Sequence, residues 1–257
     1  MTPALARRML AEALGTAMLV AAVIGSGIAA ARLSPDDVGL QLFESAVATA
    51  GVLVAIILAV GPVSGAHLNP VVTLANRALG GMTSIEAAAY IAAQFVGGAV
   101  GAVVANVMFS QPVVELATHS RSSGALWSSE VVATFGLLLV IFGVVRSGRS
   151  TAAPFAVGAY IGAAYFFTSS TSFANPAVTV ARTLSDTFAG IAPGSVPPFL
   201  VAQLVGGALA IGAVRLLYPT VAAGARDVVL PHRGDGGDPA GVDDTVLSTP
   251  SGRAPGG

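Results

Sequence analysis

Six apolar stretches, each long enough to cross a membrane, constrain this chain most. A helix needs roughly 20 apolar residues to span about 30 Å of hydrocarbon. The stretches expected to span are Met9–Ala31, Leu40–Gly61, Ser84–Phe109, Ser128–Val145, Ala153–Ser169 and Pro197–Leu217. They predict an all-α membrane protein with six transmembrane helices in contact with the lipid bilayer.

Composition excludes several other classes of protein. Of the 257 residues, 54% are hydrophobic and 10% are charged, whereas soluble domains are about 25% charged. The chain has no Cys, which excludes disulfides and Cys-based metal sites. Its net charge of −1 gives no electrostatic case for nucleic acid. We therefore expect no cofactor, no bound metal and no nucleic-acid partner.

Arginines in the short loops predict the orientation, because basic residues favour the cytoplasmic side. One side carries Arg7, Arg8, Arg146, Arg149, Arg215 and Arg226, and the other carries Arg32 and Arg121. We therefore expect a multi-pass protein of the inner (plasma) membrane with both termini in the cytoplasm. Residues 219–257 are polar and rich in Gly, Pro and Asp, which predicts a disordered cytoplasmic tail.

Matching segments indicate an internal repeat within one domain, residues 1–218. AlaAlaGlnPheValGlyGlyAla (92–99) matches ValAlaGlnLeuValGlyGlyAla (201–208), and AsnProValValThrLeuAla (69–75) matches AsnProAlaValThrValAla (175–181). Glu12 with Thr16 likewise matches Glu130 with Thr134. The halves, at about 7–109 and 128–218, each hold three spans, so the second half enters from the opposite face. Inverted repeats of this kind place a transport site near the bilayer midplane.

The two Asn-Pro pairs predict short helices that begin inside the membrane. Asn suits the N-cap, where its side-chain oxygen accepts from a free backbone N–H, and Pro suits the first helical position. The motif residues are Asn69, Pro70, Val71, Asn175, Pro176 and Ala177. Each segment has about 10–12 residues before the next loop signal, so at 1.5 Å per residue it crosses only half the bilayer.

Two re-entrant half-helices of this kind would meet with their N-termini near the centre of the membrane. Asn69 and Asn175 would then present amide donors to a passing solute. The two positive dipole ends would raise a barrier to cations and protons. The adjoining non-helical segments, 64–68 and 170–174, are tolerable at this depth only if they line a wet path. The sequence therefore predicts a pore for small neutral solutes.

SerGlyAlaHisLeuAsnProValValThrLeuAla (64–75) and SerPheAlaAsnProAlaValThrValAlaArg (172–182) closely resemble the twin pore motifs of the aquaporin/aquaglyceroporin superfamily. The resemblance extends from about Arg7 to Tyr218. It implies six tilted helices, two half-helices, passive conduction and a homotetramer with one pore per subunit. It also implies that the chain is not an enzyme.

Two acidic residues, Glu12 and Glu130, lie within predicted spans, where an unpaired carboxylate is costly and usually functional. Residues that match them in the superfamily hold the backbone of the non-helical loops, so the resemblance implies a buttressing role. The alternative is a carboxylate pair that relays protons in a coupled secondary transporter. His67 suits a pore-mouth role or a loop-packing role, and without a nearby His partner we do not expect it to bind a metal.

The superfamily has a second filter on the outer side of the Asn pair, and it usually includes an Arg. Carried over by spacing from the Asn residues, the filter positions are Thr49, Ala163, Ser172 and Val178. Val178 stands where the Arg is usual, which removes a fixed positive charge and its donors. We therefore expect a wide filter that admits polyols or hydroxylated metalloids. Arg182, four residues later, could act as a vestibule charge or cap the end of the half-helix.

Three phrases, at residues 135–140, 159–168 and 171–178, also resemble a bacterial subgroup linked to arsenic resistance. That resemblance implies conduction of arsenite or methylated arsenic acids in neutral form. A non-conducting junction or scaffold protein of the same fold would need large residues to plug the pore, and the small filter residues argue against it. An enzyme is not expected, because Ser172 has no nearby His and the sequence has no phosphate-binding Gly loop.

Overall fold

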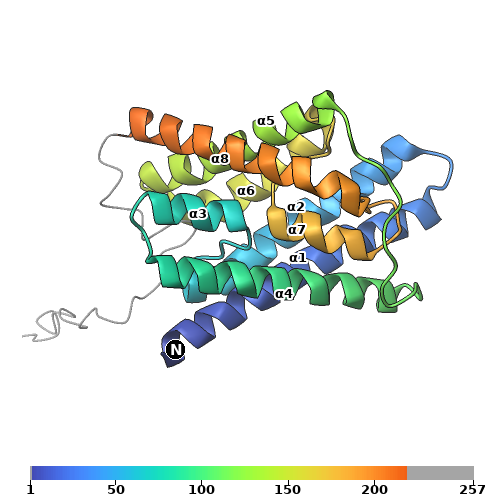
Figure 1. Ribbon diagram of the computed structural model, residues 1–257, viewed down its shortest axis with the longest axis horizontal. Coiled ribbons are helices and arrows are strands. Elements are labelled where there is room, and N and C mark those ends of the chain that lie inside the picture. The colour runs from blue at the N-terminus through green and yellow to red at the C-terminus, as the bar shows by residue number, and fades with distance from the viewer. Residues whose placement is uncertain (1, 219–257) are drawn as a thin grey trace, which may run out of the picture.

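The computed structural model describes residues 2–218, and all regular elements in this range are helical (Figure 1). The α-helices are α1 (Pro3–Leu33), α2 (Val38–Ser64), α3 (Pro70–Ala78), α4 (Ser84–Met108), α5 (Gly124–Arg146), α6 (Ala153–Phe167), α7 (Pro176–Ala181) and α8 (Val196–Leu217). Three short 3-10 helices complete the set: η1 (Ser150–Ala152), η2 (Arg182–Leu184) and η3 (Pro193–Ser195). The predicted tail, 219–257, lies outside the described residues.

Five of these helices, α1, α2, α4, α5 and α8, are long and apolar enough to cross a membrane. The remaining predicted span, Ala153–Ser169, is shorter than expected. Helix α6 has 15 residues, or about 22 Å at 1.5 Å per residue, and follows directly on η1. It ends at Phe167 because Thr168 takes an extended backbone conformation, while the Thr168 hydroxyl donates back to the carbonyl of Ala164 over 2.6 Å.

The half-helices are also shorter than predicted. Helix α3 has nine residues and α7 has six. Helix α3 ends before Gly80, whose φ of 87° lies in the left-handed region that glycine adopts without strain. Helix α7 passes into η2 at Arg182, so its last turn tightens. In Figure 1, α3 and α7 lie in the interior of the bundle toward opposite ends.

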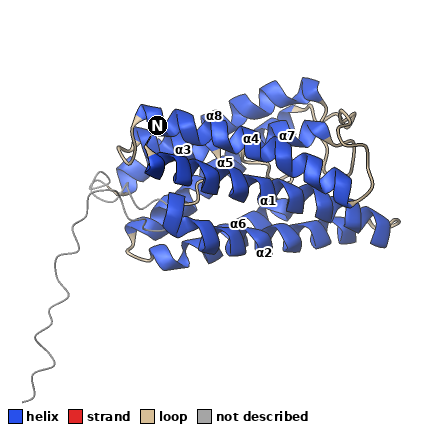
Figure 2. Ribbon diagram, turned by 90° about the horizontal axis from the view of Figure 1, so that it is seen from below, coloured by secondary structure: helices blue, strands red, loops and turns tan. Residues whose placement is uncertain are grey.

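The packing of the long helices follows the predicted inverted repeat. Helix α1 packs against α4 and α2, and its counterpart α5 packs against α8 and α6. Each half-helix contacts both α4 and α8, so the two halves of the chain share a common interior. Figure 2 shows the helices running alongside one another, with the N-terminus at the end of the bundle that holds α3.

Two glycines explain how the third helix of each half approaches the first so closely. A Cβ atom added at Gly97 would clash with the backbone carbonyl of Ala13, and one added at Gly206 would lie 2.5 Å from the carbonyl oxygen of Val131. Both glycines come from the repeated GlnXxxValGlyGlyAla sequence. Small residues at such contacts let membrane helices pack backbone to backbone.

Candidate pore at the meeting point of the half-helices

Asn69 and Asn175 cap the two half-helices, as their position before Pro predicts. The Asn69 side-chain oxygen accepts from the backbone N–H of Val71 at 2.9 Å. The Asn175 oxygen accepts from the N–H groups of Ala177 and Val178 at 3.0 and 3.3 Å. Both caps fix the amide groups in space, because each oxygen is held by its own helix.

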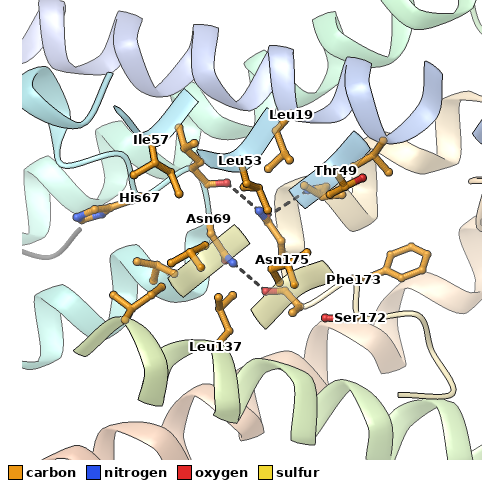
Figure 3. Close-up of a pocket in the computed structure, with 18 of the residues that line it drawn as sticks. Leu19, Thr49, Leu53, Ile57, His67, Asn69, Leu137, Ser172, Phe173 and Asn175 are labelled. Carbon is orange, nitrogen blue, oxygen red and sulfur yellow. Dashed lines mark hydrogen bonds between the residues drawn. The ribbon is translucent and has the colours of Figure 1, made fainter. Parts of the chain in front are cut away.

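The two amide nitrogens bind the opposite half of the chain (Figure 3). Asn69 donates from Nδ2 to the carbonyl oxygen of Ala174 over 2.8 Å, and Asn175 donates to that of Leu68 over 2.7 Å. Each bond uses one of the two N–H donors of the amide. One N–H of each Asn amide therefore binds the opposite loop and is not available to a solute. The second N–H of each amide remains for the cavity that both residues line.

The loops before the two Asn residues share an unusual backbone. Ala66 and Leu68 have φ values of 48° and 52°, and Ser172 and Ala174, at the equivalent positions, have 53° and 47°. Positive φ is uncommon for residues other than glycine and requires support from the surroundings. The support comes from two buried carboxylates.

Glu12 binds the loop of the first half with both of its oxygens. One oxygen accepts from the Ser64 hydroxyl at 2.7 Å and the His67 N–H at 2.9 Å, and the other accepts from the Leu68 N–H at 2.7 Å. The side chain of Gln94 donates to Glu12 at 2.8 Å and to Thr73 of α3 at 3.0 Å. Glu12 is fully buried, so its charge is met by four donors rather than by water.

Glu130 repeats this arrangement in the second half. Its oxygens accept from the Ser170 hydroxyl at 2.7 Å and from the N–H groups of Phe173 and Ala174, both at 2.9 Å. Gln203 donates to it at 2.6 Å. Gln94 and Gln203 were not predicted as site residues, although both lie in the repeated segments that indicate the duplication.

A cavity runs past the Asn pair, with His67 toward one end and Phe173 toward the other (Figure 3). Its wall is mainly apolar and includes Leu19, Leu53, Ile57, Leu137, Ile141 and Val157. Polar groups are confined to a few places along it. An apolar wall with a few fixed polar groups is typical of sites for small molecules.

Three of the four predicted filter residues line this cavity: Thr49, Ser172 and Val178. Ala163 does not line it, because it is exposed on the outer face of α6. Tyr165 lines the cavity instead, and its hydroxyl lies 3.0 Å from that of Thr49. Residues two apart lie about 200° around a helix from each other, so Ala163 and Tyr165 lie on different faces of α6.

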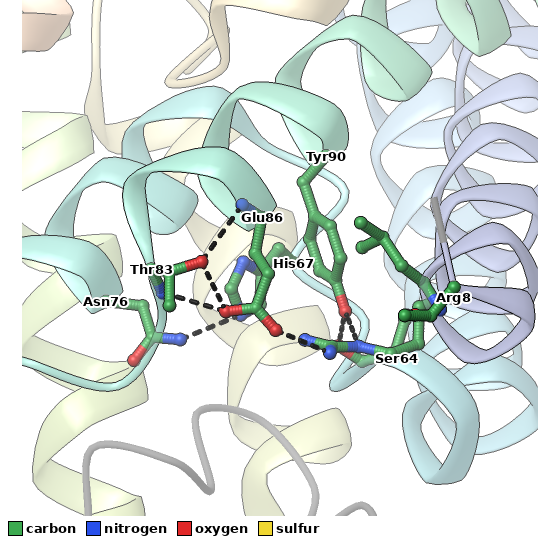
Figure 4. Close-up of polar contacts among 9 residues, drawn as sticks. Arg8, Ser64, His67, Asn76, Thr83, Glu86 and Tyr90 are labelled. Atoms are coloured by element: carbon green, nitrogen blue, oxygen red, sulfur yellow. Dashed lines mark hydrogen bonds and ion pairs between the residues drawn. The ribbon is translucent and has the colours of Figure 1, made fainter. Parts of the chain in front are cut away.

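His67 lies on the cavity wall and also within a group of side-chain contacts. Its ring is held by the Thr73 hydroxyl at 3.0 Å and the Asn76 amide at 3.3 Å. The ring also lies edge-on to Tyr90. Figure 4 shows this group beside the ion pair that Arg8 forms with Glu86 at 2.8 Å.

Arg182 also lines the cavity and is 5% exposed. Of the two roles considered, the helix-end position is observed: Arg182 is the C-cap residue of α7, and its backbone N–H donates to the carbonyls of Val178 and Val180. The side chain donates from Nε to the backbone carbonyl of Ala189, and its guanidinium lies over the Phe173 ring at 3.5 Å. Phe173 and Tyr165, the aromatic residues on the cavity wall at this end, were not predicted as site residues.

Comparisons with known proteins agree with this architecture. The family model "Major intrinsic protein" matches residues 1–174. Aquaglyceroporin AqpS of Rhizobium meliloti is 47% identical over 84% of this chain and 92% of its own length. The probable aquaporin AqpM of Archaeoglobus fulgidus is 31% identical over 82% of this chain and 96% of its own length.

The solved structures confirm the fold. The X-ray structure of the aquaglyceroporin from Plasmodium falciparum matches with a TM-score of 0.64 and 21% identity, over 84% of this chain and 98% of that one. The comparisons give no support to a proton-coupled transporter or to an enzyme. The chain therefore belongs to the major intrinsic protein family and is a membrane channel with the aquaporin-like fold.

Proposed function

We propose that this channel conducts water and small neutral polyols such as glycerol passively, along the cavity beside Asn69 and Asn175. The observation that carries the proposal is Val178, a donor-free side chain on the cavity wall one turn after Asn175. A strict water filter requires a narrow ring with strong donors, and Val supplies none. The 47% identity to a protein named as an aquaglyceroporin supports the same class of solute.

In this proposal the selective part of the pore comprises Thr49, Tyr165, Ser172 and Val178, with Tyr165 in place of the Ala163 expected from the sequence. The Ser172 hydroxyl oxygen is buried and has no hydrogen-bond partner among the described residues. A buried hydroxyl without a partner costs free energy unless a ligand or water fills the role. We propose that the Ser172 hydroxyl forms a hydrogen bond with a hydroxyl group of the solute, while the side chain of Val178 contacts the apolar part of the solute.

Glu12 and Glu130 act as loop supports in this proposal. Each carboxylate already accepts four hydrogen bonds, from two backbone N–H groups, a Ser hydroxyl and a Gln amide. Bonds of this kind fill the lone pairs that a proton relay would need. The bonded backbone segments are those with positive φ, so the carboxylates stabilise the shape of the pore wall.

The proposal extends to assembly and location. We infer a homotetramer in the inner membrane, with one pore per subunit and the N-terminus in the cytoplasm. Large apolar side chains are exposed along α1, α2, α4 and α8, as both lipid contact and subunit contact require. Cross-linking in membranes should give bands up to four subunits, and an N-terminal tag should be accessible only from the cytoplasmic side.

Arsenite and methylated arsenic acids in neutral form are further proposed solutes, since the filter lacks the usual Arg. Proteoliposome shrinkage with water, glycerol and arsenite, with a proton-sensitive dye in parallel, tests the solute class. The proposal requires glycerol flux without proton flux. Water flux alone, or solute flux that moves with protons, would contradict it.

A further inference from the structure

A second cavity adjoins the pore at the end that holds Phe173. It shares three lining residues with the pore cavity: Val23, Tyr165 and Arg182. Beyond them it is bounded by His119 and Arg121 from the connection between α4 and α5 and by Phe188 from the loop after η2. We call this second cavity the outer vestibule. Arg182 lies at the junction, because it lines both spaces.

Two guanidinium groups in this region share one aromatic ring. The guanidinium carbon of Arg182 lies 3.5 Å from the Phe173 ring centroid, and that of Arg121 lies 5.3 Å from it. Arg182 donates to the carbonyl of Ala189, and Arg121 donates to those of Gly190 at 3.0 Å and Phe188 at 3.3 Å. All of these acceptors are neutral.

Neither guanidinium forms an ion pair with an acidic side chain of residues 2–218, although the charge of Glu130 acts on both at longer range. The ion pair found among residues 2–218 joins Arg8 to Glu86, at the other end of the bundle. The nearby carboxylate of Asp186 instead accepts from the N–H and the hydroxyl of Thr118. One carboxylate, Glu130, therefore stands against two guanidiniums that repel each other, and the excess positive charge favours an anion beside them.

His119 adds no permanent charge to this group. Burial, then the positive charges of Arg121 and Arg182, lower the pKa of His119, while Asp186 acts in the opposite direction. The ring is therefore neutral at neutral pH, and the two guanidiniums are the cationic groups that face the outer vestibule. Tyr165 is the remaining titratable side chain on its wall.

Free donors are available at the junction. An Arg side chain carries five N–H donors, and the structure uses Nε of Arg182 but neither of its terminal nitrogens in a hydrogen bond among the described residues. The Ser172 hydroxyl, 5% exposed and without a partner in the same set, lines the pore cavity together with Arg182. A planar cation and a hydroxyl are donors that suit the oxygens of an oxyanion.

We propose that the outer vestibule binds a small oxyanion, such as a carboxylate, phosphonate or arsonate, between Arg121 and Arg182. The inference rests on the proposed channel function, because the neutral acid of such an anion is the species small and uncharged enough to continue into the pore. The site holds the anion next to the entrance, where it takes a proton from the outer solution before entry. A bound anion also obstructs the path of glycerol.

Methylphosphonate is a suitable probe, used at constant ionic strength against chloride. Calorimetric titration of the purified full-length channel measures binding, and glycerol flux in proteoliposomes measures obstruction. We expect methylphosphonate to bind and to slow glycerol flux. Arg182→Gln and Arg121→Gln should each weaken binding by about tenfold or more, as loss of a charge-assisted bond implies. Arg182→Lys keeps the charge but not the planar guanidinium group, so its affinity for methylphosphonate should lie between those of the parent and Arg182→Gln.

Arg32→Gln is the matched control. Arg32 also lies over a phenylalanine ring, that of Phe109 at 5.4 Å, and donates to a backbone carbonyl, but it does not line either cavity. Its binding should equal that of the parent. The proposal is overturned if the parent binds methylphosphonate no better than chloride, or if correctly assembled Arg182→Gln and Arg121→Gln bind it as the parent does. Absence of glycerol flux with binding intact would instead contradict the proposed channel function.

Discussion

Asn69 and Ala174 are 105 positions apart in the chain, yet the Asn69 amide nitrogen donates to the Ala174 carbonyl over 2.8 Å. The reciprocal bond from Asn175 to Leu68 makes the contact symmetric. The two half-helices are therefore fixed to each other through the backbone of the loops that precede them. This contact also sets the direction of the remaining amide donors, and therefore where a solute can bind beside the Asn pair.

Replacing Asn69 or Asn175 with Asp tests the role of these donors. The carboxylate cannot donate to the opposite loop, and it places a negative charge where two helix N-termini converge. We expect a channel that still assembles but leaks protons or cations, measured with a pH-sensitive dye in proteoliposomes. Asn106→Asp, at a buried Asn that is absent from the cavity wall, is the control and should not leak. Ion-tight Asp variants with normal glycerol flux would limit the Asn residues to a structural role.

Val178→Arg tests whether the missing guanidinium determines solute size. The substitution adds a long side chain with five donors to the cavity wall. Glycerol flux should fall by about tenfold, equivalent to about 1.4 kcal/mol in the barrier, while water flux falls much less. Thr49→Phe should narrow the opposite wall and act in the same direction. Val178→Leu, which adds no donor, is the control. Unchanged glycerol flux in both Val178→Arg and Thr49→Phe would place the constriction elsewhere.

The choice between Tyr165 and Ala163 has a direct test. Tyr165→Ala removes an aromatic ring from the cavity wall and the partner of the Thr49 hydroxyl, so glycerol flux should rise. Ala163→Phe enlarges a side chain on the outer face of α6 and should leave flux unchanged in assembled protein. The reverse pattern would restore the assignment of Ala163 that spacing alone predicted.

Glu12→Gln tests the support of the first loop. The amide keeps one oxygen, so its NH2 group faces either the Ser64 and His67 donors or the Leu68 and Gln94 donors, and each hydrogen bond lost there costs about 1.5–3 kcal/mol. We expect a lower thermal stability and loss of glycerol flux, with Glu130→Gln equivalent. Glu115→Gln, at an exposed carboxylate, is the control. A stable Glu12→Gln channel whose flux merely loses its pH dependence would favour a proton relay.

Much of the fold was predictable because it depends on local signals. The Asn-Pro pairs predict where α3 and α7 begin, since capping and the fixed φ of Pro act within a few residues. The ends of helices were less predictable. Helix α7 passes into η2, and α6 ends at Phe167, next to the hydrogen bond from the Thr168 hydroxyl to Ala164.

The site was predictable where the repeat supplies a second copy of the same residue. Asn69, Asn175, Glu12 and Glu130 all come in such pairs. Tyr165 has no such counterpart in the first half. The face of α6 on which it lies is determined by the packing of α6 against α2 and α5. The position of Tyr165 four residues after Ile161, which also lines the cavity, was the signal that helical periodicity offered.

Glycerol permeability without any ion gradient distinguishes a passive pore from a coupled transporter. Proteoliposomes with the full-length channel should equilibrate with external glycerol much faster than empty liposomes, and at the same rate with and without a proton ionophore. In the same liposomes, proton leak is compared between Asn69→Asp and the parent, and it should be higher in Asn69→Asp. Glycerol uptake that requires an imposed proton gradient and disappears with the ionophore would contradict a passive pore.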